Sequence, residues 1–403
     1  MKFGIATVDI TPPVGVTLWG YAPRASTWIE HPLRAEALAC ESNGRGWILI
    51  SADVGGFSLP LTDAIREEVA LSTGLPSSAV MVTATHTHSG PHVTDALWCE
   101  RSEMESAYFV ALRERLVAVA GKAWQNRADG EFVHGQATAP DFASNRRAQN
   151  PDGTWTNVWS DPEGKNNGYY DPTIDLLGVR RPDGSLDALM VNFGCHPVTY
   201  GQKAQGISAD YVGYMKDALE AMGVAKTVLF TVSGHANVDP RNCCQTSQDV
   251  VRHLGEDLAA IVAQGITDLT PVSGTGVSAL HEPWSFQTTW NLEGRMAIYF
   301  PHINAGETVA TAISCVAAGD CVLLGLPGET VSEYRKKFAA RSPFGITLLI
   351  SLANDFIGYL PTDEIIEQGA YEADICPCHP IEEVLTQQVD AVLAKAKQAK
   401  TAL

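Results

Sequence analysis

Short runs of apolar, often β-branched residues recur along the chain, separated by polar and turn-forming segments. Glycine, proline or aspartate bounds several of these runs, which is typical of strands in a largely buried sheet. The pattern predicts strands at residues 3–8, 47–51, 80–84, 176–179, 188–193, 227–232, 321–326 and 346–351.

Helical periodicity alternates with these strands. Helices are predicted at residues 103–125, at about 247–263, and from Pro380 almost to the C-terminus. In the first, Leu112, Leu116 and Val119 recur at the spacing that places them on one face. The alternation predicts an α/β fold, in which mixed β-sheets are flanked by helices.

One large domain over residues 1–403 is the simplest organisation. Apolar residues make up 45% of the chain and charged residues 18%, so a sizeable core can form. No linker, charge run or internal repeat divides the sequence. Two polar stretches without periodicity, 137–170 and 281–305, are expected to be loops that set substrate specificity, with Trp155, Trp159, Trp284 and Trp290 as candidate pocket aromatics.

The charge balance limits the partners. A formal net charge of −18 argues against nucleic acid or an anionic membrane surface, because both would be repelled. The N-terminus lacks the apolar segment of a signal peptide, and no run of about 18 apolar residues predicts a membrane span. Cytoplasmic residence without membrane insertion is therefore expected, and the oligomeric state stays open.

Nine cysteines, an odd number in mostly apolar surroundings, favour free thiols in a reducing compartment over a disulfide framework. One cluster, Cys376-Pro377-Cys378-His379, resembles a metal or redox site. Its cysteine spacing is not the two-residue gap that is usual in such sites, which favours a structural role.

Two histidines, His86 and His88, follow the predicted strand 80–84 in the segment THTHSGP (85–91). In extended backbone, residues two apart point to the same side, so both imidazoles can converge at the carboxyl end of a strand. This end is where α/β enzymes commonly place their chemistry. A metal-binding or catalytic role competes here with a hydrogen-bonded polar loop.

Further candidates follow other apolar runs. His196 comes after the strand 188–193 and is fixed by Pro197, although a buried core histidine would have the same pattern. Glu329 follows the strand 321–326, where a helix cap is the plainer interpretation. Tyr359 and Tyr371 bracket a short predicted helix and could equally fill the core.

Taken in order, these segments resemble the catalytic domain of the neutral, non-lysosomal ceramidase family. The resemblance rests on GIATVDITPP (4–13), GYA (20–22), SAD (51–53), THTHSGP (85–91) and the later segments around His196, Glu329 and Tyr359. It extends from residue 4 to about residue 375. The THTHSGP segment is its most specific motif.

The resemblance implies a zinc-dependent hydrolase with one Zn²⁺ per chain, held by His86, His196, Glu329 and Tyr359. A zinc-bound water would then attack the acyl carbon of the substrate, without a covalent protein intermediate. The resemblance also implies that three further residues face the substrate as hydrogen-bond donors or acids: His88, Arg146 and Tyr371. The general base is not assigned.

Two departures from the family pattern affect the expected substrate. The family's Gly-Asp-x-Ser/Asn-Pro segment is represented here by residues 233–240, so the pocket wall differs. The sequence ends soon after Tyr371, which leaves no room for the C-terminal β-sandwich of ceramidases. A small-molecule acyl substrate with a non-peptide amide bond is therefore expected, and a soluble one rather than ceramide.

Two other functions stay open. An esterase or lactonase would use the same metal-hydroxide attack and differ only in the demand for protonation of the leaving group. A catalytically inactive binding protein of the same fold is the alternative outside enzymes.

Overall fold

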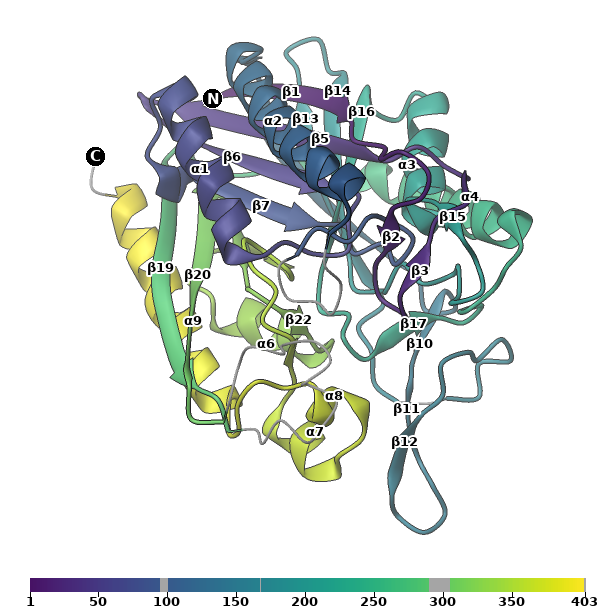
Figure 1. Ribbon diagram of the computed structural model, residues 1–403. Coiled ribbons are helices and arrows are strands. Elements are labelled where there is room, and N and C mark those ends of the chain that lie inside the picture. The colour runs from purple at the N-terminus through teal and green to yellow at the C-terminus, as the bar shows by residue number, and fades with distance from the viewer. Residues whose placement is uncertain (95–100, 167, 290–304, 402–403) are drawn as a thin grey trace.

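The computed structural model describes residues 1–94, 101–166, 168–289 and 305–401. Within these residues, three larger β-sheets lie together and helices cover their outer faces (Figure 1). This is the mixed α/β architecture that the sequence predicts. None of the helices in these ranges has the length and apolar character that crossing a bilayer requires.

The first sheet consists, in spatial order, of β7 (Val80–Ala84), β6 (Arg45–Ala52), β5 (Arg34–Ser42), β1 (Lys2–Asp9) and β8 (Ala128–Asp129). Only β6 and β7 pair in parallel. Two helices, α1 (Leu59–Thr73) and α2 (Glu103–Gln125), pack on the outer face of this sheet. The start of α2 is fixed by a capping box in which Ser102 and Glu105 each bond to the other's backbone N–H.

The second sheet consists, in spatial order, of β16 (Thr227–Val232), β14 (Leu186–Phe193), β13 (Thr173–Arg180), β9 (Glu131–Thr138) and β18 (Thr270–Pro271). Here β14 and β16 are the parallel pair. Two helices, α3 (Asp210–Ala221) and α4 (Gln248–Gly265), contact each other and cover this sheet.

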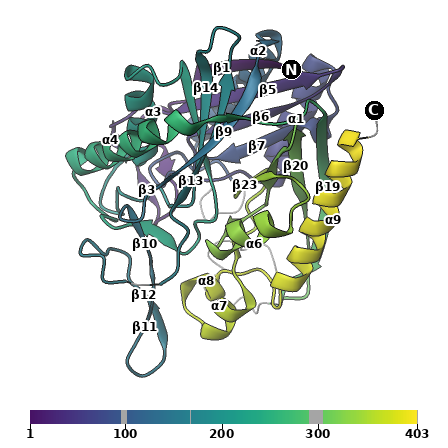
Figure 2. The same ribbon diagram turned by 180° about the vertical axis from the view of Figure 1, so that it is seen from behind.

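The third sheet consists, in spatial order, of β19 (Val277–Gln287), β20 (Thr308–Ala318), β21 (Cys321–Gly325) and β23 (Ile346–Ile350). The C-terminal helix α9 (Glu382–Thr401) lies along β19 and β20, as the view from behind shows (Figure 2). A shorter helix, α6 (Glu333–Arg341), packs against β23.

The same order of elements recurs in all three sheets. An antiparallel hairpin is followed by a helix and then by a strand parallel to the second strand of the hairpin: β5–β6–α1–β7, β13–β14–α3–β16 and β20–β21–α6–β23. The sheets also bond to one another across their inner faces. Thr83 Oγ1 donates to the Ser351 carbonyl at 3.1 Å, and Asn192 Nδ2 donates to the Leu349 carbonyl at 2.9 Å.

Short strand pairs complete the sheet structure in the described ranges: β2 (Thr17–Leu18) with β3 (Arg24–Ala25), β4 (Trp28–Ile29) with β15 (Gly206–Ile207), β10 (Ala143–Asn145) with β17 (Val238–Pro240), β11 (Arg147–Gln149) with β12 (Trp155–Asn157), and β22 (Glu329–Thr330) with β24 (Tyr359–Leu360). The pairs β10–β17 and β11–β12 fall wholly or partly in the predicted loop 137–170, and the β11–β12 hairpin projects from the body (Figure 1).

Each strand that the sequence predicts is present, with boundaries shifted by up to three residues. The loop interpretation is wrong for residues 281–287, because β19 continues to Gln287 and pairs with β20 throughout. Residues 290–304 of that predicted loop lie outside the described residues.

Candidate metal centre

Four buried side chains from all three sheets meet at the carboxyl ends of their strands. His86 follows β7, His196 follows β14 and His235 follows β16, while Glu329 follows β21 and opens β22. All three histidines have no exposed surface, and Glu329 is 3% exposed. The recurring parallel strand pairs therefore direct their following loops to one point.

The imidazoles are arranged around the carboxylate. Glu329 Oε2 lies 3.0 Å from His196 Nε2 and 3.6 Å from His235 Nε2, and Glu329 Oε1 lies 3.4 Å from His86 Nε2. One ligand atom from each of the four residues lies within 4.8 Å of the others. It is the only such group of His, Cys, Asp and Glu side chains among the described residues.

Backbone carbonyls fix the tautomer of each ring. His86 Nδ1 faces the Gly55 carbonyl at 2.5 Å, His196 Nδ1 faces that of Val238 at 3.1 Å, and His235 Nδ1 faces that of Ser233 at 2.9 Å. A carbonyl oxygen only accepts, so each Nδ1 carries a proton, and each Nε2 is the atom that would offer its lone pair to a bound cation. Second-shell carbonyls orient metal-binding histidines in this way.

The backbone at His86 is held in an unusual conformation. Its φ of 73° lies in the left-handed region, which costs a non-glycine residue about 1–3 kcal/mol at such sites. The His86 N–H donates to the Val54 carbonyl at 3.0 Å, and the ring bonds to the next residue, Gly55. The loop after β6 therefore sets both the backbone and the ring of His86.

The electrostatics of the group favour a cation. Burial alone would raise the pKa of Glu329, but His86 and His196 lower it well below its usual value, so the carboxylate is ionised. Burial lowers the pKa of His235 well below its usual value, and the neighbouring histidines act in the same direction. An ionised carboxylate thus faces a neutral imidazole.

The donor set fits a metal ion. His235 Nε2 is buried and has no hydrogen-bond partner, which is costly unless an ion takes its lone pair. Three imidazoles and one carboxylate are ligands that zinc accepts. His235 was not predicted as a ligand from the sequence, because it lies in the segment 233–240 that differs from the family pattern. Its position shortly after the strand 227–232 nevertheless follows the same pattern as His86 and His196.

Tyr359 is brought next to Glu329 by the backbone. In the parallel pair β22–β24, Tyr359 is the register partner of Glu329. The Tyr359 hydroxyl accepts a hydrogen bond from Arg146 Nη2 at 3.3 Å. The role of Tyr359 as a metal ligand stays a prediction.

Arg146 is buried in a set of interactions that the sequence did not reveal. Its Nε donates to Glu372 Oε1 at 2.8 Å, and its Nη1 donates to Asp239 Oδ1 at 3.1 Å. Asp239 Oδ1 also lies 3.3 Å from His196 Nδ1. Burial opposes the charge, but Asp239, Tyr359 and Glu372 raise the pKa of Arg146, so the guanidinium is fixed as a cation beside the centre.

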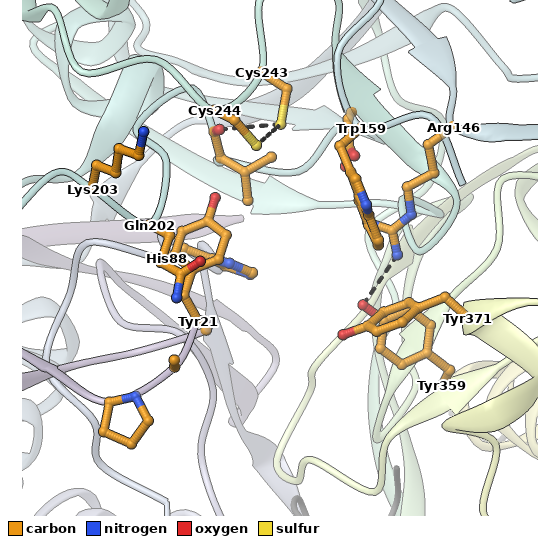
Figure 3. Close-up of a pocket in the computed structure, with 15 residues that line it drawn as sticks. Tyr21, His88, Arg146, Trp159, Gln202, Lys203, Cys243, Cys244, Tyr359 and Tyr371 are labelled. Carbon is orange, nitrogen blue, oxygen red and sulfur yellow. Dashed lines mark hydrogen bonds and ion pairs between the residues drawn. The ribbon is translucent and has the colours of Figure 1, made fainter. Parts of the chain in front are cut away.

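A cavity of about 800 Å³ borders the centre. The residues predicted to face the substrate, His88, Arg146 and Tyr371, all line it, and Tyr359 does so as well (Figure 3). The His88 Nε2 lies 3.3 Å from His86 Nε2, and burial lowers the pKa of His88 well below its usual value. The remaining wall comes mainly from the N-terminal segment 20–23 and from Val198, Gln202, Lys203, Cys243 and Cys244.

The candidate aromatic residues have different positions. Trp159 lines the cavity and contacts the Tyr371 ring edge-on, with a centroid distance of 5.2 Å. Trp155 instead lies against Arg147, and Trp284 is buried in the core. Trp290 lies outside the described residues.

The two cysteines of the Cys376–His379 cluster belong to the hydrophobic core, and the structural role that their spacing favours stays a prediction. Cys376 and Cys378 are both buried among core residues, and Cys376 Sγ donates to the Cys378 carbonyl at 2.9 Å. Neither belongs to the metal-competent group found in the described ranges.

A family model, described as the neutral/alkaline non-lysosomal ceramidase N-terminal domain, matches residues 1–271. The chain belongs to this family. The match confirms the resemblance drawn from the motifs and includes His86, His196 and His235, whereas Glu329 and both tyrosines lie beyond it. A search among curated proteins found no match.

Solved ceramidase structures confirm the fold over the whole length. Neutral ceramidase from Pseudomonas aeruginosa is 19% identical, with a TM-score of 0.79 over 98% of this chain and 74% of that one. A structure entitled "Ceramidase complexed with C2" is 18% identical, with a TM-score of 0.81 over 100% of this chain and 76% of that one. The chain is therefore a ceramidase-family hydrolase of the kind that acts on an N-acyl amide bond, with a buried group that could hold a metal ion.

Proposed function

We propose that this protein is a zinc-dependent amidohydrolase that cleaves a non-peptide N-acyl amide. The observation that carries the proposal is the convergence of three imidazole Nε2 atoms on the ionised Glu329, beside a cavity of about 800 Å³. His86, His196, His235 and Glu329 would hold the ion. His235 is favoured for the fourth place because its Nε2 has no other partner, whereas the Tyr359 hydroxyl bonds to Arg146.

When bound, zinc would polarise the acyl carbonyl and activate a water molecule for attack on the acyl carbon. The protein's own residues supply the rest. Arg146 is held in place by Asp239 and Glu372. Three of its five N–H groups bond to these carboxylates and to the Tyr359 hydroxyl, so two are left to stabilise a developing oxyanion.

His88 and Tyr371 are proposed to handle the proton on the leaving amine. His88 is neutral at neutral pH because burial lowers its pKa, so one ring nitrogen can accept a proton and the other can donate one. Its Nδ1 is buried without a partner, and its ring lines the cavity. Tyr371 lies on the opposite wall, next to Arg146 and Tyr359 (Figure 3).

The substrate is proposed to be an N-acyl compound small enough for the cavity. The cavity wall combines aromatic side chains with the cationic Lys203 at its rim, which suits an amphipathic molecule more than a purely apolar one. A series of N-acyl amides of increasing acyl length, tested beside a ceramide in detergent, would separate a soluble substrate from a membrane lipid.

Metal removal gives the first test. The purified protein is expected to contain about one zinc per chain by elemental analysis, and treatment with a chelator should abolish amide hydrolysis until Zn²⁺ is returned. His196→Ala should lose the zinc, because it removes one of the buried ligands. His379→Ala is the matched control and should keep it, since His379 lies outside the metal-competent group in the described ranges. Equal zinc in both variants would refute the site.

A second test separates the amide reaction from its ester alternative. Tyr371→Phe should lower kcat for an amide by about 10²-fold, because a poor leaving amine needs protonation. An ester of the same acyl group with a good leaving group should change by less than about threefold. Tyr169→Phe, at a half-exposed tyrosine, is the control. Equal losses on both substrates would contradict the role of Tyr371 as the acid.

A further inference from the structure

Two adjacent thiols form part of the cavity wall. Cys243 and Cys244 both line the cavity, and their Sγ atoms lie 3.0 Å apart (Figure 3). Cys243 is buried, and its Sγ also donates to the Val198 carbonyl at 3.4 Å, whereas Cys244 is exposed. Cys244 is therefore the more accessible thiol of the pair.

The backbone of this pair is bonded to the segment that follows a proposed metal ligand. The Cys244 N–H donates to the Val198 carbonyl at 3.0 Å, and the Gln245 N–H donates to the Thr199 carbonyl at 2.6 Å. Val198 is two residues beyond His196. Cys244 itself has a φ of 65°, in the left-handed region, so the turn is held by these contacts. A chemical change at the thiols would therefore move the cavity wall at Val198 through these backbone hydrogen bonds.

The two thiols differ in acidity. The contact between the two Sγ atoms lowers the pKa of Cys244 against the opposing effect of burial, and the same contact together with burial raises the pKa of Cys243. Burial raises the pKa of the other described free cysteines: Cys40, Cys195, Cys315, Cys321, Cys376 and Cys378. Among the described cysteines, Cys244 thus has the features of a reactive thiolate, and Cys243 those of its resolving partner.

We propose that Cys243 and Cys244 form a redox modification site, which a peroxide oxidises to a vicinal disulfide and a thiol reductant restores. The Cys244 thiolate attacks the peroxide, so an S–O bond forms, the O–O bond breaks, and hydrogen peroxide releases hydroxide. Cys243 sulfur then attacks Cys244 sulfur. The S–S bond forms as the S–O bond breaks, and the departing hydroxide takes the Cys243 proton to give water.

Geometry favours a reversible modification. Adjacent Cα atoms are about 3.8 Å apart, below the usual span of about 4.4–6.8 Å for a disulfide, so the bond would be strained and readily reduced. Its formation would also withdraw Cys243 Sγ from the Val198 carbonyl. The wall beside Tyr21 and Asp239 would then shift, and substrate turnover would fall; this consequence, unlike the modification, rests on the proposed function.

The test uses the intact, zinc-loaded protein and dilute hydrogen peroxide. Mass spectrometry is expected to show a loss of about 2 Da, mapped to the peptide with residues 243–244 and reversed by dithiothreitol. Turnover of an amide substrate should fall by at least about tenfold in parallel and recover on reduction. The mass change is read independently of activity, so a failure of the proposed function would not obscure it.

Two variants complete the design. Cys244→Ser should lose both the mass change and the peroxide sensitivity, and its exposed position makes it a mild substitution. Cys321→Ser, at a buried thiol in β21, should respond as the wild type does. The redox modification is overturned if no 243–244 cross-link forms, and its effect on the cavity wall is overturned if the cross-link forms and turnover stays unchanged.

Discussion

Glu329→Gln is expected to lower kcat/KM for an amide substrate by at least about 10³-fold, or about 4 kcal/mol of transition-state stabilisation. The substitution preserves shape but replaces one carboxylate oxygen with an NH₂ group and removes the negative charge. Both oxygens face imidazole Nε2 atoms, within 3.0–3.6 Å, so the charge that balances a bound cation is lost. Zinc content should fall with the activity.

The matched control is Glu67→Gln, on the exposed side of α1. It should retain both zinc and turnover. Circular dichroism and thermal unfolding of both variants, each measured without metal, would exclude a general folding defect. A Glu329→Gln protein that keeps its zinc and most of its turnover would remove Glu329 from the proposed site.

Lys216→Met is expected to lower the free energy of unfolding by about 3–5 kcal/mol. Lys216 has no exposed surface, and its Nζ lies 2.8 Å from Asp53 Oδ2 and 3.2 Å from Glu36 Oε1. Methionine has a similar length but leaves both carboxyl groups buried without this cation. Urea unfolding, monitored by tryptophan fluorescence, would measure the loss.

The size of this effect should depend on pH. Burial raises the pKa of Glu36 to about 7, although Lys216 acts in the opposite direction. Because the pKa of Glu36 is raised in the folded protein, its contribution to the free energy of unfolding is fully present below about pH 4.5 and is lost as the pH rises through about 7. Without Lys216 this loss of stability is larger, so Lys216→Met should lower the free energy of unfolding more at pH 8 than at pH 5.5.

Lys226→Met is the control for charge removal at a surface pair. Lys226 Nζ lies 2.9 Å from Asp187, but the Lys226 side chain is 67% exposed, so less than about 1 kcal/mol is expected. Similar losses in the two variants, or no pH dependence in Lys216→Met, would contradict the structural role of the buried network.

The strands found from sequence are those with continuous apolar runs, because both of their faces are covered. Strand β5 was not predicted: its small alanines favour a helix in isolation, and Glu36 interrupts the apolar pattern. Tertiary contacts stabilise the strand conformation instead, since Glu36 is buried against Lys216. Strand β19 lies at the edge of its sheet, where Pro283 and polar residues are tolerated.

At the site, local patterns predicted the histidines that follow apolar strands, and the family resemblance supplied their partners. His235 was not predicted as a ligand, because its segment differs from the family pattern, although it follows the strand β16. Arg146 is held by the carboxylates of Asp239 and Glu372. These partners could not be predicted, since they lie 93 and 226 residues from Arg146 in the sequence. The threefold recurrence of hairpin, helix and parallel strand likewise leaves no repeat in the sequence.

Because the four proposed ligands come from all three sheets, the complete site can form only after Glu329, the last of them in the sequence, has been made. During synthesis, His86, His196 and His235 leave the ribosome well before Glu329, which closes the group from the last sheet. Tight binding of an ion would thus indicate that β21 and β23 have packed against the two sheets that precede them in the sequence. Zinc uptake, followed in time during refolding, would report when assembly is finished.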